Sequence, residues 1–102
     1  MTPADLCRFI EGLLAAWSVA AEVTAAEIPG GVEARIARAS APDILAKRTH
    51  TPAGIIWEVQ AMGERARVHA SAQGAIRSLG GHLAPERPAA RVLFVSAGAA
   101  AE

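Results

Sequence analysis

Four side chains that could do chemistry together, Glu58, Gln60, Arg67 and His69, lie in the stretch 55–71. A carboxylate beside an imidazole can orient it and raise its pKa, as general-base chemistry requires, and an arginine can hold an anionic group. No nucleophile or glycine-rich phosphate loop accompanies them, so the sequence predicts no catalytic residue, and a solvated cross-strand pair is the competing interpretation. We treat the four as a candidate polar sheet-face cluster.

The cluster depends on a β-hairpin whose turn is predicted at Gly63-Glu64. Apolar and polar residues alternate over 55–62 and again over 66–71, which is typical of half-buried strands. A two-residue turn of this kind uses the positive φ that glycine tolerates. It would place the carboxylate opposite the imidazole on the polar face, and Trp57 opposite Ala70 on the apolar face. A slip of one residue would reverse both faces.

The histidines and the single cysteine show no spacing typical of a metal site. The chain lacks CxxC, HxxxH and HExxH, whereas a zinc site needs three or four converging ligands. We therefore expect no metal and no cofactor. Arg65, Arg67 and His69 form a basic stripe that could contact RNA, but the exposed aromatic residues that stack bases in such modules are missing. Nucleic-acid binding is therefore not favoured.

Length and composition favour a small soluble protein. The chain has 102 residues, which predicts a single domain over 1–102 with a frayed tail at 97–102. Ten basic and ten acidic residues cancel, so no general attraction to nucleic acid or to anionic membranes is expected. No segment approaches a membrane-spanning length. We expect a cytoplasmic protein, although a fragment of a longer chain would show the same features.

The first predicted element is an amphipathic helix over 3–17. Thr2 is a suitable N-cap, Pro3 suits the first turn and Asp5 lies near the positive helix end. Its apolar stripe needs a sheet or a partner to cover it. We therefore name this stripe as a candidate protein interface, formed by Leu6, Phe9, Ile10, Leu13 and Trp17.

The middle of the chain is ambiguous. Pro29-Gly30-Gly31 predicts a turn, so we expect a first hairpin that pairs 21–28 with 32–39. Ser40 and Asp43 are spaced like a helix cap, which predicts a short helix that ends near Lys47. The alternative is a single helix over 32–48.

The last predicted elements are a helix and a strand. Ser71 is a suitable N-cap, and Gly80-Gly81 predicts the end of that helix. Residues 91–96 are continuously apolar apart from their ends, which is typical of a central strand. The predicted order is α-β-β-α-β-β-α-β. This is a small two-layer α+β sandwich, with a mainly antiparallel sheet and helices on one face, in a ferredoxin-like arrangement or a variant of it.

The second half of the chain resembles a known family. Pro52-Ala53-Gly54, the alternating hairpin, a short helix, Glu86-Arg87-Pro88 and an apolar strand resemble the periplasmic ferredoxin-like domains of type II secretion M-type and pilus-assembly O-type proteins. The resemblance covers about half of the chain at positions of low specificity, and those proteins also carry an N-terminal transmembrane helix. It implies a structural role in an oligomer.

We therefore expect a non-enzymatic protein-interaction or self-assembling module, with a homodimer as its simplest form. The edges that a small open sheet exposes agree with this expectation. The first alternative is a small-ligand binder or small enzyme that uses Glu58 and His69 with Arg67. The second alternative is RNA binding through a basic sheet face.

Overall fold

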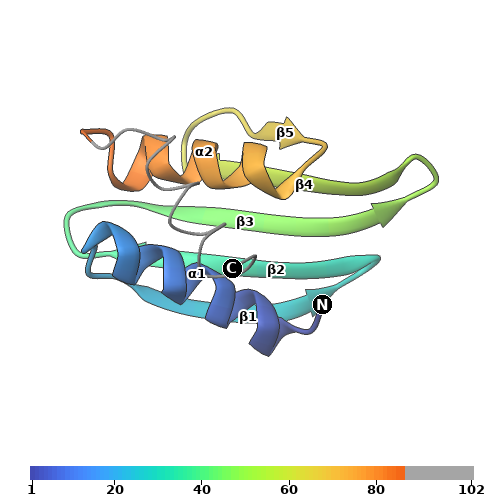
Figure 1. Cartoon of the computed structure of the whole chain (residues 1–102), viewed down its shortest axis with the longest axis horizontal. Coiled ribbons are helices and arrows are strands. Elements are labelled where there is room, and N and C mark those ends of the chain that lie inside the picture. Colours follow the sequence, from blue (N-terminus) through green and yellow to red (C-terminus); the bar gives the residue numbers. More distant parts are fainter. Residues whose placement is uncertain (87–102) are drawn as a thin grey trace, which may run out of the picture.

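The computed structural model describes residues 1–86. These residues form an antiparallel sheet of five strands in the order β1-β2-β3-β4-β5, with two helices lying against one face (Figure 1). Helix α1 packs on β1 and β2, whereas α2 packs on β4 and β5. The elements are α1 (Pro3–Trp17), β1 (Glu22–Ile28), β2 (Gly31–Arg38), β3 (Ala41–Thr51), β4 (Gly54–Ala61), β5 (Arg67–His69) and α2 (Ala72–Leu83).

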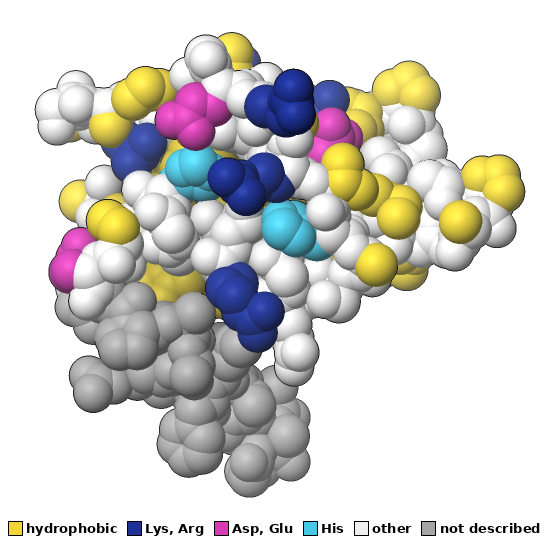
Figure 2. Space-filling model, turned by 90° about the horizontal axis from the view of Figure 1, so that it is seen from above, with side chains coloured by type: hydrophobic (Ala, Val, Ile, Leu, Met, Phe, Trp, Pro, Cys, Tyr) yellow, Lys and Arg dark blue, Asp and Glu magenta, His cyan; other side chains and the backbone are white. Residues whose placement is uncertain are grey.

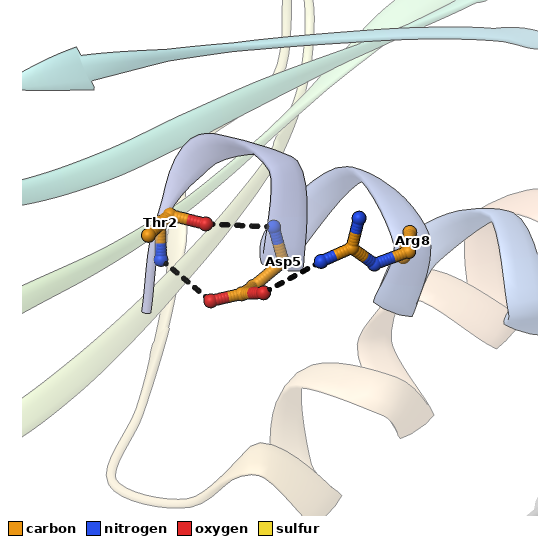
Figure 3. A network of polar contacts seen from close by, with 3 residues as sticks. All are labelled: Thr2, Asp5 and Arg8. Atoms are coloured by element: carbon orange, nitrogen blue, oxygen red, sulfur yellow. Dashed lines mark hydrogen bonds and ion pairs between the residues drawn. The ribbon is translucent and has the colours of Figure 1, made fainter.

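Helix α1 begins at a complete capping box, as its sequence predicts. The Thr2 hydroxyl accepts a hydrogen bond from the Asp5 amide at 3.1 Å, and the Asp5 carboxylate accepts one from the Thr2 amide at 3.0 Å (Figure 3). The same carboxylate pairs with the Arg8 guanidinium at 2.9 Å. Two amide donors that no helical carbonyl can reach are thus satisfied, and the predicted start of the helix is confirmed.

The predicted first hairpin is also confirmed. Strand β1 pairs antiparallel with β2, from Glu22 opposite Ala37 to Ile28 opposite Gly31. The connecting turn has Gly30 at φ 81°. Gly31, the next residue, is also required as glycine, because a Cβ there would overlap the Arg48 carbonyl oxygen of β3. The two glycines thus have separate purposes: one makes the turn and the other lets two strands approach.

The predicted short helix after Ser40 is wrong, and so is the alternative of a single helix over 32–48. The segment forms β3, which pairs with β2 on one side and β4 on the other. The Asp43 carboxylate accepts a hydrogen bond from Arg35 at 2.8 Å instead of capping a helix. Ile44 and Ala46 are buried while the residues on either side of each are half-exposed, so the burial period is two, as in a strand.

Helix α2 is capped by Ser71 as predicted but does not end at Gly80-Gly81. It continues to Leu83, because Leu79 and Leu83 are both buried in the core and tertiary packing outweighs the weak helix propensity of glycine. Gly80 faces the Trp17 ring, where a Cβ would lie 3.4 Å from a ring carbon. The glycine therefore makes room for the Trp17 ring of α1.

One hydrophobic core lies between the helices and the sheet. It includes four residues of the α1 stripe, alternate residues of β2, β3 and β4, and the inner face of α2. The largest fully buried side chains are Leu6, Ile10, Ile36, Ile44, Val59 and Leu79. Burial of one such side chain contributes roughly 1.5–3 kcal/mol, so this single core accounts for the packing of both helices.

The described chain is thus a small α+β domain with the order α-β-β-β-β-β-α. The predicted fold class is correct at that level, but the order differs because β3 replaces the expected middle helix. The predicted strand over 91–96 lies outside the described residues, as does the expected tail at 97–102. Within residues 1–86, no helix is long and apolar enough to cross a membrane.

Candidate functional site: a basic pocket between β5 and α2

The register between β4 and β5 differs by one residue from the predicted register. Trp57 lies opposite His69 and Glu58 lies opposite Val68. The reason is the turn, which closes one residue early: the Glu64 amide donates to the Ala61 carbonyl at 2.9 Å, with Gly63 at φ 90°. The chain then runs irregularly until β5 begins. The predicted hairpin exists, but its predicted register is wrong.

The one-residue shift separates the four residues of the polar sheet-face cluster. Glu58 and Gln60 point away from the helices, and the Gln60 amide donates to the Glu64 carbonyl at 2.9 Å. Arg67 and His69 lie opposite the core residues Val59 and Trp57, so they share the helix side of the sheet. The predicted Glu58–His69 pair therefore does not form, because its members lie on opposite faces.

Arg67 and His69 instead meet α2 across a pocket of about 420 Å³. Figure 2 shows basic and histidine side chains on the face formed by β5 and α2, with acidic side chains directly beside some of them. No Asp or Glu of residues 1–86 is among the residues that line this pocket, which we call the β5–α2 pocket. They are Arg67, His69, Gly74, Arg77, Ser78, Gly81 and His82.

The pocket exists because of the small residues of α2. Gly74, Ser78 and Gly81 lie three or four positions apart, so they follow one face of the helix. The gap at Gly74 is filled from β5: a Cβ there would lie 3.1 Å from both Cβ and Nδ1 of His69. Around Gly81 a Cβ would meet nothing within 4 Å. The helix thus makes room for an imidazole at one end and leaves an open space at the other.

Two polar atoms at the pocket are buried without a hydrogen-bond partner in the described chain. They are Nε2 of His69 and Oγ of Ser78, and both residues line the pocket. Leaving such a group unsatisfied costs about 1–3 kcal/mol. Buried polar groups are nearly always paired in native proteins, with protein groups or with ordered water, so these two atoms have unused hydrogen-bonding capacity beside the pocket.

Three cations outside the pocket each face another group of the chain. Arg35 pairs with Asp43 at 2.8 Å and Lys47 with Glu33 at 3.8 Å. The Arg48 guanidinium lies 5.9 Å from the centre of a Trp57 ring, where cation–π attraction holds it. Each of these three cations therefore has a local partner and does not extend the basic surface at the pocket.

Arg38 anchors the C-terminal end of α2. Its guanidinium donates to the His82 carbonyl at 3.1 Å and to the Pro42 carbonyl at 2.9 Å. It thereby satisfies an end carbonyl of the helix and ties α2 to the end of β2 and the start of β3. In contrast, Arg67 and Arg77 make no ion pair within residues 1–86, so two guanidinium charges at the pocket lack a counter-charge there.

The α1 residues that form the candidate protein interface do not line the β5–α2 pocket. Leu6, Ile10, Leu13 and Trp17 are buried against the sheet, and Phe9 packs on Trp57 with ring centroids 5.7 Å apart. This stripe therefore supplies the core of the molecule.

Cys7 and the histidines form no metal site in the described part of the chain. The Cys7 thiol donates to the Val23 carbonyl at 3.7 Å, and burial followed by the nearby Glu11 charge raises the pKa of the thiol. Within residues 1–86, no three His, Cys, Asp or Glu side chains gather in a way that could hold a metal ion.

Sequence reasoning identified Arg67 and His69 but missed Arg77, Ser78 and His82. Their signal is a second stripe on α2, in which small and basic residues recur three or four positions apart beside the apolar stripe. Comparison of the chain with protein-family models, curated proteins and solved structures gives no match.

Proposed function

We propose that the protein is a binding module that holds an anionic ligand in the β5–α2 pocket. The observation that carries the proposal is the convergence of Arg67 and Arg77 with the orphaned Nε2 of His69 and Oγ of Ser78. All four side chains can donate hydrogen bonds, the imidazole when Nε2 carries hydrogen. Charge-assisted bonds from guanidinium to an oxyanion are among the strongest that a surface site can make.

The electrostatics of the pocket support the same ligand class. Arginine remains charged at any physiological pH, and no carboxylate of residues 1–86 lines the pocket. The net charge of the whole chain is zero, so the attraction is local to this surface and not a property of the molecule. A local cationic pocket on a neutral protein selects a small anion over a long polyanion, which needs an extended basic surface.

The test is a titration of isotope-labelled protein with inorganic phosphate and with sulfate, at constant ionic strength in chloride. We expect amide chemical shifts to change at residues 67–69 and 74–82 and little elsewhere. Arg77→Ala removes a charge-assisted contact of about 1.5–3 kcal/mol, which corresponds to at least about tenfold weaker binding. Arg77 is exposed, so the variant should fold.

The matched control is Arg65→Ala. Arg65 is exposed and near β5 but does not line the pocket, so this variant makes the same change in net charge without removing a contact. Its affinity should remain within about twofold of the native value, because screened surface charges contribute little. Shifts spread evenly over the surface, or equal losses in both variants, would overturn the proposal.

We also propose a second function, self-association of two copies through the outer edge of β1. Within residues 1–86, β1 pairs with β2 only and forms the end of the sheet (Figure 1). Its seven residues contain no proline or lysine, its two charged side chains, Glu22 and Glu27, lie near its ends, and the register shift of the sheet lies in β2. Edges that stay unpaired usually carry such protective features, so a regular edge of this length suits pairing with another strand.

Light scattering after size exclusion tests this second function. A dimer is expected for the native chain, and Ala26→Lys should convert it to a monomer, because lysine on an edge strand opposes pairing. Ala16→Lys is the control, since Ala16 is equally exposed but lies on α1. A native chain that remains monomeric at high concentration would exclude self-association and leave the pocket proposal intact.

A further inference from the structure

We infer that the ligand of the β5–α2 pocket is a small organic phosphate monoester, held as its dianion. This inference rests on the proposed anion-binding function and narrows it to one chemical class. The narrowing comes from three properties of the pocket: its charge, the directions of its donors and its size.

The charge of the pocket matches a dianion. Arg67 and Arg77 supply two permanent positive charges, and no acidic side chain of the described residues lines the pocket beside them. A carboxylate or a sulfate ester carries one negative charge and would leave one guanidinium without a counter-charge. A phosphate monoester has its second pKa near about 6 and is mainly dianionic at pH 7, so it balances both arginines.

The donors reach the pocket from three places along the fold. Arg67 and His69 come from β5, Arg77 and Ser78 from the middle of α2, and His82 from its last turn. A carboxylate offers two oxygens in one plane, which a single guanidinium satisfies by a parallel pair of bonds. A terminal phosphate offers three oxygens in a tetrahedral arrangement, so it can accept from several directions at once.

The size of the pocket leaves room for an organic group. Its volume of about 420 Å³ is within the range of roughly 300–1,000 Å³ that small-molecule sites occupy and exceeds what a phosphate group fills. Gly74 and Gly81 are seven residues apart on α2, or about 10 Å along the helix axis. Between them the residues of α2 that line the pocket are Arg77 and the small Ser78, so the organic part can lie against the helix surface beside Ser78.

Two probes of equal size and unequal charge test the inference: phenyl phosphate, a dianion at pH 7.5, and phenyl sulfate, a monoanion. We expect phenyl phosphate to bind about tenfold more tightly or better, since it satisfies the second guanidinium. We also expect it to bind more tightly than inorganic phosphate, because only the ester uses the remaining volume. Calorimetric titration gives all three affinities.

A space-filling variant tests the role assigned to the organic group. Gly81→Leu fills the open end of the pocket without changing its charge, and a Cβ there meets no atom within 4 Å, so the fold should tolerate it. The variant should weaken the binding of phenyl phosphate more than the binding of inorganic phosphate. Gly12→Leu is the control, because Gly12 is an equally open helix position on α1, remote from the pocket; it should change neither affinity.

The possible outcomes distinguish a failure of this inference from a failure of the proposed anion-binding function. Equal affinity for phenyl phosphate and phenyl sulfate would overturn the assignment of a dianionic ligand and would leave the proposed anion binding in place. Tighter binding of a phosphoserine peptide than of phenyl phosphate would overturn the small-molecule class. No binding of any of these anions would overturn both the inference and the proposed function.

Discussion

Asp5 shows how one side chain links helix stability to pH. Its pKa is lowered from the ordinary value of 3.8, chiefly by the hydrogen bond from the Thr2 amide, then by the Thr2 hydroxyl and by Arg8 (Figure 3). Because the folded-state pKa is depressed, the carboxylate contributes stability that is fully present above pH 3.8. That contribution disappears as the pH falls through the lowered folded value.

The first prediction follows from this linkage. Asp5→Asn should be less stable than the native chain at pH 7, and the difference should vanish at acid pH, because a protonated carboxyl caps the helix no better than an amide. Urea unfolding followed by circular dichroism between pH 2 and pH 7 measures both curves. A stability difference that stays constant over this range would show that Asp5 does not act through its charge.

Cys7 carries the second prediction at this scale. Burial raises the pKa of the thiol above 9.0, and the Glu11 carboxylate adds to the increase. Since only the thiolate is nucleophilic, iodoacetamide at pH 8 should alkylate native Cys7 severalfold more slowly than the urea-unfolded chain. Glu11→Gln should speed the native reaction, because it removes a negative neighbour. Equal rates in folded and unfolded protein, measured by mass spectrometry, would contradict this account.

Helix α2 combines two requirements that conflict at Gly74. Alanine there would gain up to about 1 kcal/mol of helix propensity, but its Cβ would lie 3.1 Å from the His69 side chain. The third prediction is that Gly74→Ala stabilises less than Gly12→Ala, where nothing lies within 4 Å, and that it weakens phosphate binding by displacing the imidazole. Thermal unfolding and the phosphate titration measure the two effects. An equal gain in stability with unchanged phosphate binding would rule out steric contact at His69.

Local signals explain which elements the sequence could predict. The cap at Thr2, the cap at Ser71 and the turn at Pro29-Gly30 each act through neighbours in sequence, and all three are confirmed. The segment after Ser40 was mistaken because its cap-like spacing is local, whereas the pairing of β3 with two neighbouring strands is not. Pairing with neighbouring strands overrides a local preference for helix when both edges of the segment are hydrogen-bonded, as in β3.

The candidate site was only partly predictable for a related reason. Arg67 and His69 were identified by residue type, but their partners depended on a strand register that one turn residue decides. Arg77, Ser78 and His82 come from another element, and only the packing of α2 beside β5 brings them close. A register error therefore does more than misplace one pair: it assigns the same side chains to the wrong face and the wrong kind of chemistry.

At the scale of the whole molecule, two tryptophans report on different parts of one core. Trp17 lies at the end of α1 against Gly80 of α2, and Trp57 lies in β4 beneath Phe9 and Arg48. Both belong to the same buried cluster. If that cluster is a single cooperative unit, the helix pair and the sheet cannot unfold separately.

The fourth prediction tests this cooperativity with single-tryptophan variants. Trp17→Phe leaves only the sheet reporter, and Trp57→Phe leaves only the helix reporter. The indole Nε1 of Trp17 is buried without a partner in the described chain, so phenylalanine removes an unsatisfied donor and the cost of the smaller ring is partly offset. In each variant the urea midpoint from fluorescence should coincide with that from circular dichroism. Midpoints that separate in either variant would mean that the helices detach before the sheet unfolds, so that the β5–α2 pocket could open while β1 to β4 remain folded.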